Sequence, residues 1–358
     1  MKLFLCPSCA QQLYFENNRC LACNSDVLYD PDPAEFVIAG HSGAFGCANA
    51  EECACNWVAT GSGYCRACRL NKTIPDLTIA GNRERWIRVE AAKKRVIYSL
   101  LSFGLAVEAK AAAGEEIGIA FDFLADPIGG GPGGERILTG HDNGVITLNV
   151  AEADSPEREK RRIAMGETYR TLLGHFRHEL GHYYWDRLIR DDEERLTGFR
   201  ATFGDERPDY EEALKRHYAQ PPAPDWQERH ISAYAASHPW EDWAETWAHY
   251  VHIVDTLEMA DSLKWSIGAM QSASGRLLTP DTDKDGSDRH PGDDGAEVAP
   301  PLTGSSFDAA LARWIVLSNA SNSINRCMGL PDLYPFVISQ AVAEKLAFID
   351  RLLRPRVR

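Results

Sequence analysis

The chain has 358 residues and a net charge of −14, from 52 acidic and 38 basic residues. This acidic balance argues against a general nucleic-acid or anionic-membrane binder, so we expect neither nucleic acid nor a membrane as a partner. A hydrophobic fraction of 44% and a charged fraction of 25% are typical of a globular protein with two or three domains. No stretch is long enough to span a bilayer, and the apolar start at residues 1–6 is too short for a signal peptide, so we expect a cytoplasmic location.

Cysteines dominate the N-terminal part, since nine of the ten lie within the first 68 residues. In a cytoplasmic protein thiols stay reduced, which favours metal binding over disulfides. Two CxxC turns separated by ten residues come first, and each turn offers two thiolates. Two such turns close a tetrahedral site, so one structural Zn²⁺ is predicted on Cys6, Cys9, Cys20 and Cys23.

A second group of cysteines follows, and it offers one thiol more than a four-cysteine site needs. Cys65 and Cys68 form another CxxC turn, while Cys47, Cys53 and Cys55 compete for the two remaining places. Only one residue separates Cys53 from Cys55, and cysteines so close rarely bind one ion together in a zinc ribbon. We expect a second structural Zn²⁺ on Cys47, Cys55, Cys65 and Cys68, with a set that uses Cys53 as the alternative. Both ions would supply folding energy that so small a core lacks.

The segments after the cysteines alternate between helix and strand patterns. Residues 73–77 are predicted to be a linker, and Asn82 is expected to cap a helix that runs to Ala113 and ends at Gly114. A strand is predicted at residues 117–123.

A hairpin is expected next, with a short first strand at residues 137–139. Its turn, Asp142-Asn143-Gly144, is typical of a type I′ turn. The second strand is predicted at residues 145–150, and we expect its edge to hold an extended substrate by strand pairing.

The segment at residues 155–190 has apolar residues at helical spacing, with Gly166 as a candidate break, and contains the sequence HELGH. Its two histidines, His178 and His182, are four residues apart and share one face of a helix, where both imidazoles can bind one Zn²⁺. Glu179 then lies beside the ion and can take a proton from a water molecule there, as a general base does in metallopeptidases. His175 shares this face and is expected to support the site or to pack in the core.

A catalytic zinc needs a third protein ligand and one open position. The HxxGxxH continuation is missing after His182, which disfavours a ligand set of three histidines. Pro239 fits the first turn of a helix that continues past Val254, and this helix carries Glu241 and Glu245 on one face. One carboxylate could bind zinc while the other orients a ligand histidine, but the spacing alone does not choose between them.

The remaining segments carry weaker patterns. The helical pattern fades at residues 197–224, and the acidic, Gly- and Pro-rich residues 279–300 are predicted to form a mobile insertion. A helix capped by Ser305 and a last helix at residues 342–353 are expected, and Cys327 is predicted to be a buried apolar side chain.

The motif and the helix that carries Glu241 resemble the gluzincin metallopeptidases, above all the catalytic domain of anthrax lethal factor. In these enzymes a glutamate on a later helix binds zinc, and an acid four residues on orients a ligand histidine. The resemblance implies Glu241 as the third ligand and Glu245, in place of the usual Asp, as the orienting acid. It also implies that Tyr234, seven residues before Glu241, stabilises the oxyanion. Over most of its length the chain resembles a bacterial family of zinc-ribbon metallopeptidases.

Together these features predict an α+β fold with two parts. A double zinc-ribbon module at residues 1–76 precedes a mainly helical, zincin-like domain with a small mixed sheet at residues 77–358. The expected function is a zinc-dependent peptidase that acts on peptides or proteins, with one catalytic and two structural zinc ions. The alternative is a binding module whose ribbons recognise protein or nucleic acid and whose HExxH zinc is structural or vestigial.

Overall fold

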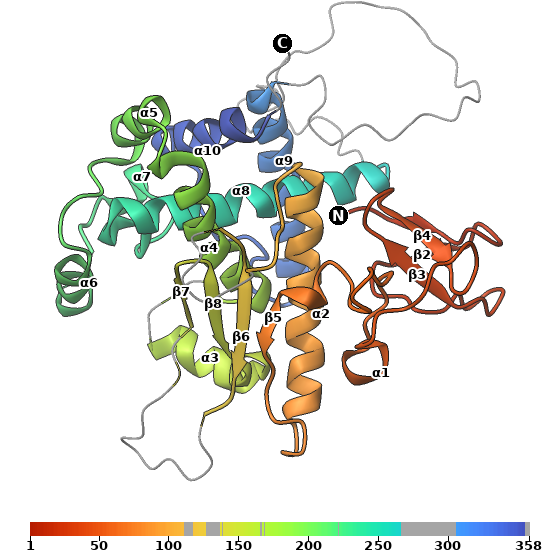
Figure 1. Cartoon of the computed structure of the whole chain (residues 1–358). Coiled ribbons are helices and arrows are strands. Elements are labelled where there is room, and N and C mark those ends of the chain that lie inside the picture. The colour runs from red at the N-terminus through yellow and green to blue at the C-terminus, as the bar shows by residue number, and fades with distance from the viewer. Residues whose placement is uncertain are drawn as a thin grey trace, which may run out of the picture.

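The computed structural model describes residues 1–110, 117–126, 137, 139–164, 167, 169–220, 222–265 and 306–354. It confirms the α+β class, because a cysteine-rich region of short strands is followed by a largely helical part with one small mixed sheet (Figure 1). The predicted insertion at residues 279–300 and the predicted helix end at Gly114 lie outside the described residues.

The N-terminal region is made of two short antiparallel hairpins, which are not stable alone in water. In the first, β1 (Phe4–Leu5) pairs with β2 (Gln12–Leu13), and in the second β3 (Val27–Asp30) pairs with β4 (Glu35–Ile38). A single helical turn, α1 (Ala50–Cys53), follows them.

Aromatic packing joins the hairpins to the first long helix, α2 (Asn82–Ser102). The ring of Tyr98 on α2 lies 5.4 Å from that of Phe15, 6.1 Å from that of Tyr29 and 6.5 Å from that of Phe4, measured between centroids. One hydrophobic core therefore continues from the cysteine-rich region into the helices, as the position of the hairpins beside α2 in Figure 1 also shows.

The central sheet has the strand order β5-β6-β8-β7. Strands β5 (Asn71–Thr73), β6 (Ala120–Leu124) and β8 (Val145–Asn149) run parallel, and β7 (Gly140–Asp142) lies antiparallel to β8. The expectation that residues 145–150 present a free edge is wrong, because β8 is paired on both sides. The predicted linker is also shorter than expected, since Thr73 ends the edge strand β5.

The predicted type I′ turn between β7 and β8 is confirmed. Asn143 and Gly144 have φ angles of 45° and 78°, and this turn type requires positive values at both positions. A Cβ atom on Gly144 would lie 2.3 Å from the carbonyl oxygen of Gly118, so only glycine fits there. The first strand of the hairpin begins at Gly140, later than the predicted residues 137–139.

Helix α2 ends at Ser102 rather than at the predicted Ala113, and the reason is a glycine C-cap. Gly104 has a φ angle of 70°, its N–H donates to the carbonyl of Leu101, and the N–H of Leu105 donates to the carbonyl of Leu100. This pair of hydrogen bonds is the Schellman motif, which closes a helix.

The predicted helix over residues 155–190 is divided into α3 (Ser155–Ala164) and α4 (Leu172–Trp185), and α4 continues as a π-helical turn (Asp186–Arg190). The hydroxyl of Thr171 accepts a hydrogen bond from the N–H of Gly174, so α4 has its own N-cap.

The remaining helices follow α4 along the chain. Two of them, α5 (Glu193–Phe203) and α6 (Tyr210–Ala219), fall where the sequence pattern fades. Helix α8 (Pro239–Ser262) begins at Pro239 as predicted, and α7 (Trp226–Arg229) lies just before it. Two C-terminal helices complete the described chain, α9 (Phe307–Cys327) and α10 (Gln340–Leu353).

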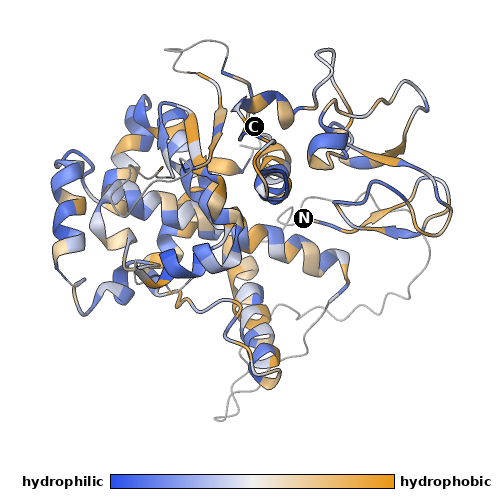
Figure 2. Cartoon of the chain, turned by 90° about the horizontal axis from the view of Figure 1, so that it is seen from below, coloured by the Kyte–Doolittle hydropathy of each residue, from blue (hydrophilic) through white to orange (hydrophobic). Residues whose placement is uncertain are grey.

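The helices of the described residues carry both hydrophobic and hydrophilic residues. Figure 2 shows hydrophobic and hydrophilic residues alternating along the helices, as expected when one face of each is buried. Cys327, predicted to be buried, is exposed at the end of α9. Within the described ranges, no helix combines the length and apolar character that a membrane span requires.

Candidate metal centres

The close approach of α4 and α8 brings the HExxH motif to the later glutamates. A Cβ atom on Gly181 of α4 would lie 3.1 Å from the Cα atom of Ala244 on α8, so the two helices nearly touch. The indole N–H of Trp243 donates to the carbonyl of Gly181 over 2.8 Å and fixes this contact. Small residues at the crossing therefore let side chains on either side of it meet.

Three ligand atoms converge beside this crossing. The Nε2 atoms of His178 and His182 lie 3.2 Å apart, and Glu241 Oε2 lies 3.0 Å from the first and 3.5 Å from the second. In a tetrahedral zinc site with bonds of about 2.0–2.1 Å, neighbouring ligand atoms are about 3.3 Å apart. Two imidazole nitrogens facing each other at this distance also need a cation or a proton between them. The residues present therefore fit a zinc ion.

The neighbouring glutamate, Glu245, takes a different position. Its Oε1 lies 2.7 Å from Nδ1 of His178, and its Oε2 accepts a hydrogen bond of 2.7 Å from the hydroxyl of Ser232. A carboxylate at Nδ1 holds the proton there and leaves Nε2 free to bind a metal. Spacing alone does not distinguish the two glutamates, but their contacts do. Glu241 Oε2 faces the Nε2 atoms of both histidines, whereas Glu245 contacts Nδ1 of His178.

The charges of the histidines also act on Glu241. The side chain of Glu241 is only 1% exposed, and this burial acts to raise its pKa. The nearby His182 and His178 outweigh the burial and hold the pKa of Glu241 well below its usual range. Glu241 is therefore a carboxylate, which is the form that binds a metal ion.

Tyr234 lies beside the cluster of His178, His182 and Glu241, with its ring centroid 6.0 Å from the ring centroid of His178. Burial, and then the charge of Glu241, raise the pKa of Tyr234, so its hydroxyl keeps its proton and can donate a hydrogen bond. The charge of Glu179 contributes to the same shift. The structure thus brings His178, His182 and Glu241 together as one group, with Glu245 and Tyr234 beside His178.

Sequence reasoning missed Tyr210, the first residue of α6. Its hydroxyl donates a hydrogen bond to Oε1 of Glu241, whereas the other oxygen, Oε2, lies 3.0 Å from Nε2 of His178. No motif or spacing connects Tyr210 with Glu241, 31 residues later, so no signal in the sequence could have found it.

His175 lies away from the metal cluster and contacts a buried acid, Glu152. Its Nδ1 lies 2.6 Å from Oε2 of Glu152, and the hydroxyl of Thr139 donates to Oε1 of Glu152 over 2.6 Å. Arg170 lies 3.4 Å from the same carboxylate. His175 therefore connects the motif helix to Glu152, which is neither the support of the metal site nor the packing in the core that the sequence predicts.

This network predicts a pH-dependent contribution to stability. Burial acts to raise the pKa of Glu152, but His175, Arg170 and Thr139 outweigh it and hold the pKa at about 2. Since this lies below the ordinary value of 4.5, the ionised carboxylate stabilises the fold above about pH 4.5, and the contribution disappears as the pH falls towards about 2. It amounts to roughly 3 kcal/mol.

We expect Glu152→Gln to lower the free energy of unfolding at neutral pH and the deficit to shrink in acid. Urea unfolding of wild type and variant across this pH range measures the difference, and losses common to both chains, such as metal release, cancel. A deficit that stays constant across the range would contradict the assignment.

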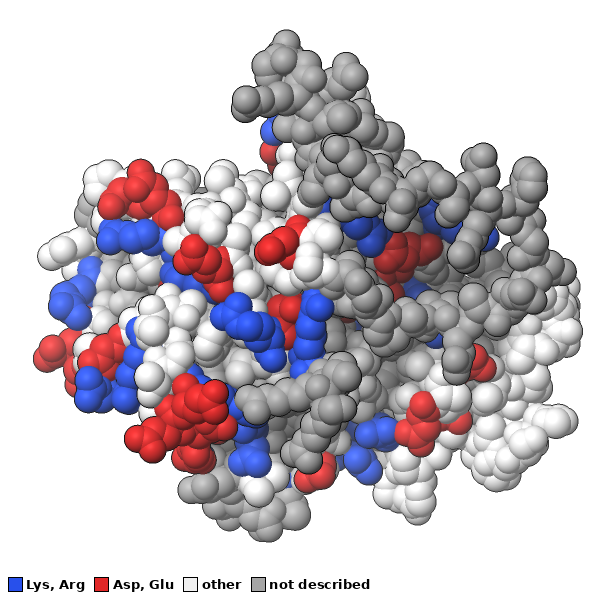
Figure 3. Space-filling model, turned by 90° about the horizontal axis from the view of Figure 1, so that it is seen from above, with Lys and Arg blue, Asp and Glu red and all other residues white. Residues whose placement is uncertain are grey.

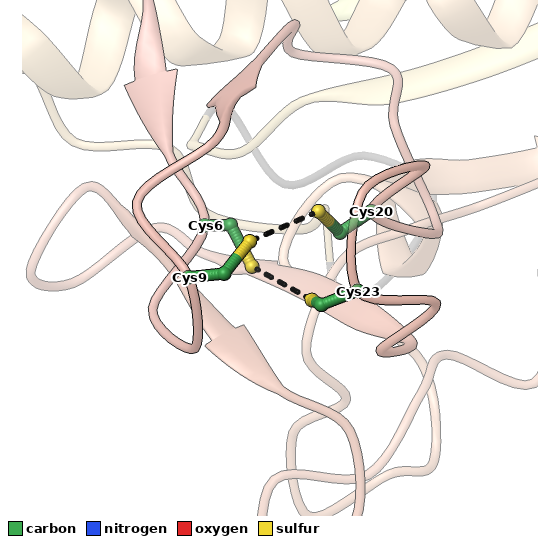
Figure 4. A group of neighbouring side chains, drawn as sticks. All are labelled: Cys6, Cys9, Cys20 and Cys23. Atoms are coloured by element: carbon green, nitrogen blue, oxygen red, sulfur yellow. Dashed lines mark hydrogen bonds between the residues drawn. The ribbon is translucent and has the colours of Figure 1, made fainter.

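The first cysteine group lies in the first hairpin and the turn that follows it. Figure 4 shows the four sulfur atoms of Cys6, Cys9, Cys20 and Cys23 turned towards one another. Cys6 Sγ lies 3.7 Å from Cys23 Sγ, and Cys9 Sγ lies 3.6 Å from Cys20 Sγ. A disulfide would require about 2.05 Å, whereas the sulfur atoms of a tetrahedral zinc site are about 3.8 Å apart. The distances fit zinc.

The second group brings four buried thiols together, and they are those of Cys47, Cys55, Cys65 and Cys68. Cys55 Sγ lies 3.7 Å from both Cys65 Sγ and Cys68 Sγ. The fifth thiol, Cys53, belongs to a separate group with Cys68 and Glu90, and it donates a hydrogen bond to the carbonyl of Asn49. The geometry therefore favours the set without Cys53.

A buried lysine accompanies this second group. Burial acts to lower the pKa of Lys94, but Cys55 and Glu90 outweigh it and raise the pKa, so Lys94 keeps its positive charge. A site of four thiolates and one Zn²⁺ carries two negative charges, and Lys94 offsets part of them.

Comparison with known proteins agrees with both parts of the chain. Residues 82–352 match the family described as "Putative zinc-binding metallo-peptidase", and residues 3–79 match a zinc-ribbon domain. Uncharacterized proteins of Mycobacterium tuberculosis and Mycobacterium bovis are 40% identical over 357 residues, which cover 99% of this chain and 95% of theirs. No solved structure matches. The chain therefore belongs to the family of zinc-binding metallopeptidases described in this way and carries a zinc-ribbon domain in front of the metallopeptidase part.

Proposed function

We propose that the protein is a zinc-dependent peptidase whose catalytic zinc is held by His178, His182 and Glu241. The observation that carries this proposal is the set of ligand-atom distances of 3.0, 3.2 and 3.5 Å beside the general-base candidate Glu179. When bound, zinc lowers the pKa of a water molecule and polarises the carbonyl of a peptide bond.

The protein groups around the ion have separate tasks in this proposal. Glu179 accepts the proton of the attacking water and then passes it to the leaving amine. The Tyr234 hydroxyl, which keeps its proton, donates a hydrogen bond to the oxygen that becomes negatively charged. Glu245 and Ser232 hold the ring of His178 in its orientation.

The sheet edge closest to this site belongs to β7, in place of the 145–150 strand expected from the sequence. The imidazole ring of His141 on β7 lies nearly parallel to that of His182, with 6.3 Å between the ring centroids and 15° between the ring planes. β7 ends the described sheet, so its outer edge can pair with an extended chain. We propose that a peptide or protein substrate lies along β7.

The cysteine-rich region has a structural role in this proposal, with one zinc ion on each four-cysteine group. We propose that residues 1–76 form a zinc-ribbon module that packs on α2 and adds strand β5 to the central sheet, and that the protein works in the cytoplasm. The surface seen in Figure 3 shows acidic and basic side chains intermixed in small groups, and on this face such a surface offers no broad basic field for nucleic-acid phosphates.

A second function, protein recognition by the ribbons, is favoured by exposed apolar side chains. Leu21 is 87% exposed, Phe45 69%, Leu5 64% and Tyr14 60%, and all four lie in the cysteine-rich region. Exposed apolar side chains that gather on one face are typical of a contact surface. The ribbons could then bring substrate proteins to the peptidase.

Zinc content tests the proposal directly. We expect three zinc ions in the wild-type chain, one on each of the two four-cysteine groups and one on His178, His182 and Glu241. His178→Ala should hold two, because the last of these groups loses a ligand. Elemental analysis gives the zinc content, and hydrolysis of a peptide pool by the wild type, abolished in the variant, tests the activity. Equal zinc content in both chains would overturn the ligand assignment, and three zinc ions without hydrolysis would favour the binding module.

A further inference from the structure

The two oxygens of Glu241 have different neighbours, and one of them accepts a hydrogen bond from another side chain. Oε2 lies 3.0 Å from Nε2 of His178, within the ligand cluster. Oε1 accepts the hydrogen bond of the Tyr210 hydroxyl. A carboxylate can bind a metal through one oxygen or through both, and a hydrogen bond to one oxygen favours binding through the other.

We infer that Tyr210 is a positioning residue that makes Glu241 bind the zinc ion through Oε2 alone. This inference rests on the proposed function. Two histidines and one oxygen fill three corners of a tetrahedron and leave the fourth open, as a catalytic site requires. A glutamate that bound through both oxygens would crowd that corner.

Contacts on several sides hold Tyr210 in place. The Tyr210 ring meets the ring of His238 edge-on at 5.4 Å and that of Trp240 at 5.6 Å. Asp209 caps α6 by accepting a hydrogen bond from the N–H of Glu212 over 2.8 Å. The start of α6 is therefore built against the start of α8, where Glu241 lies.

His238 links the starts of the two helices. Its Nδ1 accepts a hydrogen bond of 3.1 Å from the N–H of Trp240 and so caps α8. Its Nε2 donates to the carbonyl of Pro208, 3.3 Å away and two residues before Tyr210. Any displacement of α6 would therefore act on both Glu241 and its helix cap, so Tyr210 is held at a defined distance from the carboxylate.

Tyr210→Phe tests the inference, because it removes only the hydroxyl and keeps the ring contacts. We expect the affinity for the third zinc ion and kcat each to fall by about 10- to 100-fold, the usual effect of losing a group that orients a metal ligand, with little change in KM. Competition with a chelator measures the affinity without any substrate.

A spectrum tests the coordination itself. The third zinc ion is removed with a mild chelator and replaced by Co²⁺, and metal analysis confirms that the two cysteine groups keep their zinc. We expect the visible absorption of Co²⁺ to weaken in Tyr210→Phe, because five-coordinate Co²⁺ absorbs less strongly than four-coordinate Co²⁺. An unchanged spectrum together with an unchanged zinc affinity would overturn the inference.

Tyr250→Phe is the matched control. Tyr250 lies on α8, the helix that carries Glu241, and like Tyr210 it donates a hydrogen bond to a carboxylate, that of Asp350, over 3.0 Å. It should leave the spectrum and the zinc affinity as in the wild type, and an equal change in this control would overturn the inference. A wild-type chain that binds no metal at His178, His182 and Glu241 would refute the proposed function itself. Wild-type metal binding with no response to Tyr210→Phe would refute the inference alone.

Discussion

Replacing Glu179 with glutamine is expected to lower kcat/KM for peptide hydrolysis by about 10²- to 10⁴-fold, the usual contribution of a general base. Glutamine has nearly the same shape but cannot accept the proton of the attacking water. Glu179 is absent from the three-residue ligand cluster, so the zinc content should stay at the wild-type value. Loss of activity with full zinc content would show that Glu179 acts in proton transfer and does not bind the metal.

The measurement combines peptide hydrolysis with elemental analysis on the same preparation. Glu84→Gln is a suitable control, because Glu84 is an exposed carboxylate in the first turn of α2 and lies outside the site. It should hydrolyse peptides at the wild-type rate. If Glu179→Gln keeps its zinc and hydrolyses peptides as fast as the wild type, the proposed mechanism is wrong.

Replacing Cys65 with serine is expected to have the largest effect on stability. Cys65 has no exposed surface, and its sulfur lies 3.7 Å from that of Cys55. Structural zinc binding in small zinc-finger peptides contributes about 10–16 kcal/mol, as much as the whole stability of an ordinary domain. Loss of this zinc should therefore unfold more than the ribbon alone.

The contacts of the second cysteine group carry this effect into the helical part. Cys68 Sγ lies 3.7 Å from Oε2 of Glu90, and the same carboxylate binds Lys93 over 2.7 Å. The Lys93 ammonium lies 5.4 Å from the centre of the Phe121 ring, which packs edge-on against Phe176 of the motif helix at 5.6 Å. Cys65→Ser should therefore also release the zinc held by the HExxH motif.

Two matched variants make this prediction specific. Cys9→Ser alters an exposed cysteine of the first group and should remove one zinc ion while the others stay bound. Cys53→Ser should keep all three ions, because Cys53 lies outside the favoured four-cysteine set. Zinc content and thermal unfolding of the three variants measure the outcome. A Cys65→Ser chain with two zinc ions and wild-type hydrolysis would contradict the proposed coupling.

Several predictions from the sequence are wrong because the same local pattern is compatible with more than one tertiary arrangement. The alternation at residues 145–150 predicts a strand but contains no information on whether both of its edges are paired. Helix α2 continues in pattern beyond Ser102, yet the left-handed conformation of Gly104 ends it. Cys327 is apolar and was expected to be buried, but it lies at the exposed end of α9.

Spacing along the chain is enough to predict which side chains share one local element. A spacing of four residues puts His178 and His182 on one face of a helix, and CxxC spacing puts two thiols in one turn, because backbone geometry sets both distances. The side chains that face these groups come from distant parts of the chain and depend on how the helices pack. In the tertiary structure, Glu241 Oε2 lies beside Nε2 of His178, Glu245 lies at Nδ1 of His178, and the Tyr210 hydroxyl donates to Oε1 of Glu241. These contacts depend on how closely helices pack at small residues and on where α6 begins, and neither follows from spacing along the chain.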